Sequence, residues 1–157
     1  MKIKLLTIGK TDSRPLQQLI DEYCKRLGFY IPFSMDIIPD IKNTKNLTTK
    51  QQKIAEGKEL LKKIEKSDAV ILLDENGKLY NSIQFSAFLQ KKMNSGLKKI
   101  VFVIGGPYGF SDDVYNRCNE KVSLSPMTFS HQMVRLFFTE QLYRSFTILR
   151  NEPYHHH

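Results

Sequence analysis

A short apolar run that ends in a glycine-rich turn constrains the fold of this chain more than any other feature. Ile100–Ile104 contains only β-branched and aromatic residues, and it leads directly into Gly105-Gly106-Pro107-Tyr108-Gly109. Such a run is typical of a strand buried on both faces, as in a parallel sheet. The glycines leave the backbone open to a flat ligand, although Gly-Gly-Pro is also an ordinary way to end a strand.

Strand-like and helix-like segments alternate along the rest of the chain. Apolar runs predict strands, and 3.6-residue periodicity with capping residues predicts helices between them. An Asn76-Gly77 dipeptide predicts a tight turn, and Ser130 is the expected N-cap of the last helix. The sequence therefore predicts one α/β domain over residues 1–157, with a mainly parallel sheet flanked by helices. The expected strands are 2–9, 33–38, 69–73, 98–104 and 122–124, and the expected helices are 14–29, 49–66, 82–94, a short one after Ser111, and one from Ser130; residues 39–49 are the expected long flexible loop.

Charge and composition indicate the class of partner. The net charge is +8, and eight lysines stand between Lys42 and Lys66 against three glutamates. This excess predicts a polyanionic partner, with nucleic acid ahead of membrane, although part of it must be the solvated face of a helix. No apolar run approaches the roughly 18 residues of a membrane span. Cys24 and Cys118 are isolated, which favours a reducing cytoplasm.

Several familiar site types are absent from the sequence. There is no phosphate-binding Gly-x-x-x-x-Gly-Lys-Ser/Thr loop and no Gly-x-Gly-x-x-Gly after the first strand. There is also no His-Glu-x-x-His motif or cluster with metal-ligand spacing, so no metal is expected. These absences argue against an NTPase and against a conventional dinucleotide or Rossmann-type methyltransferase site.

Three segments that follow strands are expected to meet at one edge of the sheet. They are Leu73-Asp74, Ile104–Gly109 and Leu124–Phe129. Ligands of open parallel sheets bind at the carboxyl ends of the strands. Apolar side chains and free backbone groups suit a flat, largely neutral purine better than a triphosphate. Leu73 and Leu124 can equally be plain core leucines at strand ends.

The last helix is apolar over a wide arc. A terminal helix of this kind predicts burial on two sides, by its own sheet and by a partner subunit. Glu140 and Arg144 are spaced to pair at i and i+4.

Seven motifs along the chain are informative as an ordered set. They are Ile8-Gly9-Lys10, Leu73-Asp74-x-x-Gly77-Lys78, Ile104–Gly109, Leu124–His131, Val134-Arg135, Glu140–Arg144 and Asn151–His155. Taken together, they resemble the RlmH family of SPOUT methyltransferases, over essentially the whole chain. The resemblance implies an S-adenosylmethionine-dependent enzyme that methylates N3 of a pseudouridine in 23S ribosomal RNA, within the assembled ribosome, and releases S-adenosylhomocysteine. It also implies a C-terminal trefoil knot over about residues 70–157 and a homodimer whose interface completes the active site.

The resemblance assigns residues to two groups. Arg144, Tyr154 and His155 are the candidates at the reacting base: Arg144 to hold a phosphate or base carbonyl, Tyr154 to stack or hydrogen-bond, and His155 to receive the proton. His131, at a helix start, is expected to have a polar or capping role. The candidates for the methyl donor are Leu73, Gly105, Gly106, Leu124, Ser125, Pro126, Met127, Thr128 and Phe129.

Two other functions are alternatives at this point. A non-catalytic RNA- or ribosome-binding factor would use the same basic surface. The missing early glycine loop and the basic surplus argue against the other, a conventional α/β methyltransferase for a small molecule. Arg144 can also serve only as the partner of Glu140, and His156 and His157 belong either to the native tail or to an expression tag.

Overall fold

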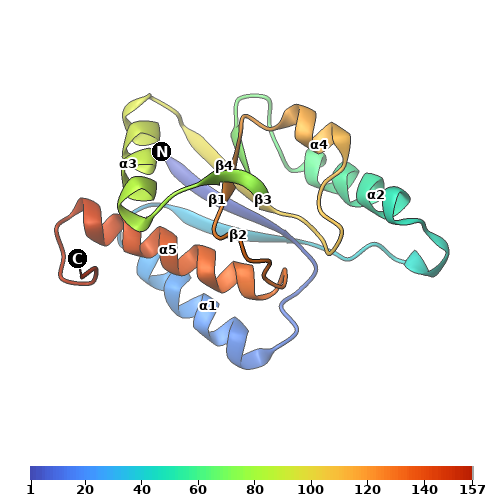
Figure 1. Ribbon diagram of the computed structural model, residues 1–157, viewed down its shortest axis with the longest axis horizontal. Coiled ribbons are helices and arrows are strands. Elements are labelled where there is room, and N and C mark those ends of the chain that lie inside the picture. Colours follow the sequence, from blue (N-terminus) through green and yellow to red (C-terminus); the bar gives the residue numbers. More distant parts are fainter. Residues whose placement is uncertain (157) are drawn as a thin grey trace.

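The computed structural model describes residues 1–156, and His157 lies outside the described residues. Strands and helices alternate as the sequence predicts (Figure 1). Within residues 1–156, no helix combines the length and apolar character needed to cross a bilayer. The elements are β1 (Lys2–Ile8), α1 (Arg14–Leu27), β2 (Phe33–Ile38), the 3₁₀ helix η1 (Thr44–Asn46), α2 (Thr49–Lys62), β3 (Ala69–Leu79), α3 (Ser82–Asn94), β4 (Lys99–Ile104), α4 (Asp112–Arg117), β5 (Glu120–Ser123) and α5 (Met133–Leu149).

The strands form one parallel sheet in the order β2-β1-β4-β3-β5. β4 lies at its centre, where Phe102 is in register with Leu5 of β1 on one side and Ile71 of β3 on the other. Every residue of β4 is buried, which explains its continuous apolar sequence. The predicted parallel α/β fold is confirmed.

The two faces of the sheet carry different helices (Figure 1). Side chains alternate between the faces, so Ile100, Phe102 and Ile104 contribute to one core cluster and Val101 and Val103 to the other. The first cluster also contains buried residues of α1, α3 and α5, and the second contains those of α2 and α4. The basic helix α2 and the terminal helix α5 therefore cover opposite faces.

The predicted tight turn at Asn76-Gly77 is wrong. β3 continues to Leu79 and pairs with β5 again after a shift in register between Leu73 and Lys78. Gly77 packs directly on the β5 backbone, because a Cβ there would lie 2.6 Å from the Val122 nitrogen. Long-range pairing has overridden the local turn preference of the dipeptide.

Helix boundaries also differ from the predicted ones. α5 begins at Met133 rather than directly after Ser130, since residues 131–132 form a turn. Ser130 Oγ accepts the Met133 N–H at 3.1 Å, so the serine closes this preceding turn. α1 and α2 end at Leu27 and Lys62, earlier than expected, and the expected loop 39–49 contains η1.

Hydrogen bonds from Arg135 connect the start of α5 to the carboxyl end of β1. The Arg135 side chain is fully buried and donates to the carbonyls of Ile8 (2.7 Å), Gly9 (2.9 Å) and His131 (3.2 Å), and to Thr11 Oγ1. Burial lowers the pKa of this guanidinium. These contacts fix the position of the segment between β5 and α5 relative to the carboxyl end of β1. The knot itself stays a prediction from the family resemblance.

Candidate functional site

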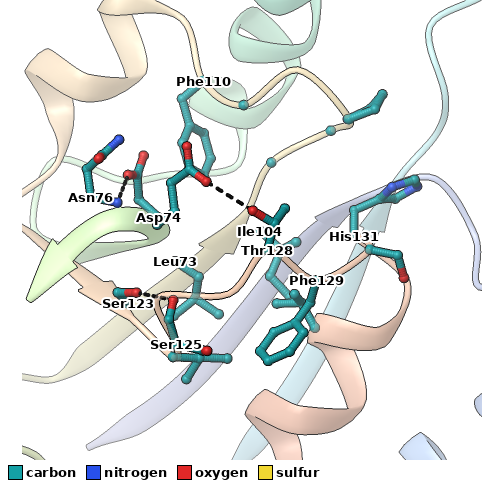
Figure 2. A pocket seen from close by; sticks show the side chains of 18 of the residues that line it. Leu73, Asp74, Asn76, Ile104, Phe110, Ser123, Ser125, Thr128, Phe129 and His131 are labelled. Carbon is teal, nitrogen blue, oxygen red and sulfur yellow. Dashed lines mark hydrogen bonds between the residues drawn. The ribbon is translucent and has the colours of Figure 1, made fainter. Parts of the chain in front are cut away.

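A pocket of about 550 Å³ lies at the carboxyl edge of β3, β4 and β5 (Figure 2). The three segments predicted to meet at this edge do meet. The pocket is lined by residues 73–76, 104–110, 122–125 and 127–131, together with Tyr115 and Val134. A volume of this order suits a ligand the size of a nucleoside derivative.

The predicted donor residues lie on the pocket walls, with one exception. Leu73, Gly105, Gly106, Leu124, Ser125, Met127, Thr128 and Phe129 all line it. Pro126 is exposed in the same loop and does not. Figure 2 shows Leu73 and Phe129 as apolar wall residues, and the Phe129 ring packs 4.9 Å from that of Phe137 on α5.

Hydrogen bonds within the loops fix their shape. Ser123 Oγ donates to the Ser125 carbonyl at 2.9 Å, and Ser125 Oγ accepts the Met127 N–H at 2.9 Å (Figure 2). In the glycine loop, the Gly109 N–H donates to the Gly106 carbonyl at 3.1 Å, and Gly109 has a φ of 85° that favours glycine. The loops thus present ordered backbone groups to a ligand.

The pocket also contains polar residues that the sequence analysis did not select. Asp74 is held in place because its carboxylate accepts the Asn76 N–H at 2.8 Å and the Tyr115 hydroxyl. Burial, followed by this bond to Asp74, raises the pKa of Tyr115, so Tyr115 remains a neutral donor. A carboxylate fixed in this way is suited to accept hydroxyl groups of a ribose. Its position directly after the apolar run Ala69–Leu73 was the available signal.

His131 lies on the pocket wall (Figure 2). Its carbonyl accepts from Arg135, as described above. This bond uses the backbone, so the polar or capping role expected of the His131 side chain stays a prediction. Within residues 1–156, no group of three or more His, Cys, Asp or Glu side chains is arranged to hold a metal ion.

The three residues predicted at the reacting base form a separate cluster. Arg144 Nη2 donates to Glu140 Oε1 at 2.6 Å, and its guanidinium lies 4.7 Å from the centre of the Tyr154 ring. Arg144 Nη1 lies 3.4 Å from His155 Nδ1. Because a guanidinium has no acceptor, Arg144 donates in this contact and the proton of a neutral His155 is on Nε2. The predicted Glu140–Arg144 pair is confirmed.

Aromatic residues hold the C-terminal tail beside this cluster. The Tyr154 ring packs 4.8 Å from Tyr143, and its hydroxyl lies 3.2 Å from that of Tyr23 on α1 and 3.1 Å from Glu140 Oε1. Burial, and then the bond with Tyr23, raises the pKa of Tyr154. Tyr154 therefore stays protonated and acts as a hydrogen-bond donor. Tyr23, which contacts Tyr154, was not predicted from the sequence, and Glu140 was predicted only as the ion-pair partner of Arg144.

Helix α5 runs from the pocket-lining segment 127–131 at its start to the C-terminal tail at its other end (Figure 1). Val134 lines the pocket, whereas Arg144 stands ten residues later on the same helix, about 15 Å along its axis. None of Arg144, Tyr154 and His155 lines the pocket. One chain therefore does not bring its two groups of predicted site residues together.

Both groups lie within the part of the chain that matches known proteins. The family model described as "Predicted SPOUT methyltransferase" matches residues 1–155. The chain belongs to this family. It is 67% identical to the ribosomal RNA large subunit methyltransferase H of Flavobacterium johnsoniae and 68% identical to that of Flavobacterium psychrophilum, over 99% of both chains in each comparison. The protein of the same name from Parabacteroides distasonis is 58% identical over the same share.

The match to the SPOUT family model includes the residues of both the pocket and the tail. The match runs from the first strand through the glycine loop to His155, so it includes every residue assigned to the donor or to the reacting base. The predicted family is confirmed.

Proposed function

We propose that this SPOUT protein transfers a methyl group from S-adenosylmethionine to N3 of a pseudouridine in 23S ribosomal RNA. The observation that carries this proposal is the pocket at the carboxyl edge of β3, β4 and β5, walled by apolar side chains and glycine backbone. Relatives up to 68% identical, named as large-subunit ribosomal RNA methyltransferases, support the substrate class. The net charge of +8 is consistent with an RNA partner in the cytoplasm.

The pocket fits the adenosine part of the donor. Leu73, Leu124 and Phe129 offer apolar surface to a purine, and Gly105 and Gly106 leave the main chain open to its edge. Asp74 is placed to accept ribose hydroxyls. When bound, the donor supplies an already activated methyl group, so the protein needs mainly to align the reacting atoms and accept a proton.

A second copy of the chain is needed to complete the site. Apolar side chains stay exposed around the pocket and on the adjoining face of α5: the exposed fractions are 74% for Met127, 52% for Tyr108 and 38% for Phe137. Burial of this surface in a homodimer would let the tail cluster of one chain face the pocket of the other. We therefore assign the donor to one subunit and the reacting base to the tail of its partner.

The tail cluster holds the base and moves its proton. Glu140 balances the charge of Arg144 and fixes its orientation. In this proposal a base carbonyl accepts from Arg144, and His155 accepts the proton from N3. Tyr154 remains protonated and donates a hydrogen bond to, or stacks on, the same base.

Methyl transfer to ribosomes tests the proposal. Ribosomes lacking the modification are incubated with donor labelled in the methyl group, and the nucleosides of the digested 23S RNA are separated by mass spectrometry. The proposal predicts label in N3-methylpseudouridine, and free 23S RNA serves as the comparison substrate. Label in another nucleoside contradicts the assigned atom, and donor-independent binding to ribosomes alone supports a non-catalytic ribosome-binding factor.

A further inference from the structure

A buried carboxyl group lies directly behind the glycine loop. Glu56 projects from α2, and only 4% of its surface is exposed. Its Oε1 accepts from Gln52 Nε2 at 3.0 Å. Its Oε2 is buried and has no hydrogen-bond partner among residues 1–156. A buried carboxyl oxygen without a partner is costly and requires an explanation.

Glu56 faces the pocket through Gly106. A Cβ built on Gly106 would lie 2.7 Å from Glu56 Oε1 and 2.8 Å from its Cδ, so the carboxyl occupies the place of a side chain at this position. Gly106 itself lines the pocket. Only the backbone of one residue therefore separates this acidic group from the ligand space.

The groups around Glu56 do not neutralise it through a direct bond. Asp40 and His131 are the charged or titratable groups that act on it, with opposite effects, and burial raises its pKa more than either neighbour changes it. Arg135, a buried cation at the start of α5, donates to carbonyls and to Thr11 rather than to Glu56. A positive ligand charge in the pocket would favour the ionised form of a carboxyl group that burial otherwise disfavours.

We infer that Glu56, acting through the Gly106 backbone, makes the pocket distinguish the positively charged methyl donor from its uncharged thioether product. The inference rests on the proposed function, because it concerns the same pocket. S-adenosylmethionine carries a sulfonium charge that S-adenosylhomocysteine lacks, while the two molecules share every other group except the methyl. Glu56 thereby favours binding of the donor and release of the product.

The size of the effect follows from the electrostatics of a partly buried site. At an effective dielectric constant of about 20, two unit charges about 10 Å apart attract strongly enough to change a binding constant roughly tenfold. The cation also favours the ionised carboxyl, so donor binding releases protons from Glu56. Donor affinity should therefore rise with pH through the range in which Glu56 titrates, whereas product affinity should not change there.

Titration calorimetry of the whole protein tests this inference. Dissociation constants for donor and product are measured for the wild type and for Glu56→Gln, which keeps the shape of the side chain. The ratio of product to donor dissociation constant should fall about tenfold in the variant, through weaker donor binding. Glu59→Gln is the matched control: it removes a charge from the same helix, where Glu59 pairs with Lys62 at the surface, and should leave the ratio unchanged.

Two further measurements separate the possible outcomes. Repeating the donor titration in buffers of different ionisation enthalpy should show proton release by the wild type and none by Glu56→Gln. Glu56→Asp, which keeps the charge, should recover part of the ratio if the first variant folds poorly. An equal loss of affinity for both ligands indicates a structural role and overturns the inference. If neither ligand binds the wild type, the proposed function fails instead.

Discussion

At the scale of single residues, the site depends on close approaches that leave no room for added atoms. Gly106 is bounded by ligand space on one side and by the Glu56 carboxyl on the other. The obvious expectation from sequence is that a side chain at 106 would obstruct the ligand directly. The structure shows that a Cβ at position 106 would instead meet the Glu56 carboxyl. A side chain there would therefore push the glycine loop away from α2.

Gly106→Ala should weaken binding of S-adenosylhomocysteine at least tenfold, because a shift of the loop misplaces its backbone groups. Calorimetry with this uncharged ligand makes the result independent of the charge on Glu56. The double variant Gly106→Ala, Glu56→Ala should recover much of the lost affinity, since the carboxyl is then absent. Equal affinity of the single and double variants would show that the added methyl acts in the pocket rather than on Glu56.

The tail residues should affect turnover and not donor binding. His155→Ala should lower single-turnover methylation about 100-fold, and Tyr154→Phe should lower it about tenfold through loss of one hydrogen bond. The donor dissociation constant should stay within twofold in both variants. His156→Ala, next along the exposed tail, is the control. Unchanged single-turnover rates would remove His155 and Tyr154 from the reacting site.

At the scale of elements, α5 connects the two halves of the site, and its start is held by a buried cation. Arg135 donates to three carbonyls and one hydroxyl, in a fork geometry that a lysine ammonium cannot reproduce. Arg135 therefore determines where the pocket-lining segment 127–131 meets the end of β1.

Arg135→Lys should lower the free energy of unfolding by about 2–4 kcal/mol, because buried carbonyls lose their donors. Urea unfolding followed by circular dichroism measures the change. Arg150→Lys, an exposed substitution on the last turn beside Tyr30, should change it by less than about 0.5 kcal/mol. If Arg135→Lys lowers the free energy of unfolding no more than Arg150→Lys does, Arg135 does not hold the start of α5 in place.

The same elements show what could be predicted from sequence. The central strand and the three pocket loops were predictable, because a run such as Ile100–Ile104 has few alternative structures. The absence of a turn at Asn76-Gly77 was not predictable, because the packing of Gly77 against the β5 backbone depends on a strand that comes much later in the sequence. Glu56 was also missed, since a glutamate within a lysine-rich helix resembles any solvated residue until the helix is placed against Gly106.

At the scale of the whole molecule, one chain separates its two groups of proposed site residues, the pocket and the tail, along α5. The pocket has the backbone and apolar surface that a donor needs, and the tail has the groups that a reacting base needs. In a dimer with twofold symmetry, each pocket would receive the partner's tail, so two complete sites form from two chains. The proposed mechanism depends on this exchange of tails between subunits.

Mixing two inactive variants tests whether the pocket and the tail of one site come from different subunits. Gly106→Val removes the pocket of one protein, His155→Ala removes the tail function of the other, and an equimolar mixture is unfolded, refolded and assayed for methyl transfer to ribosomes. If the site forms between subunits, half of the dimers carry one intact site, and the mixture recovers about one quarter of wild-type activity. Activity no higher than the mean of the two separate variants would show that pocket and tail act within one chain and would contradict the account.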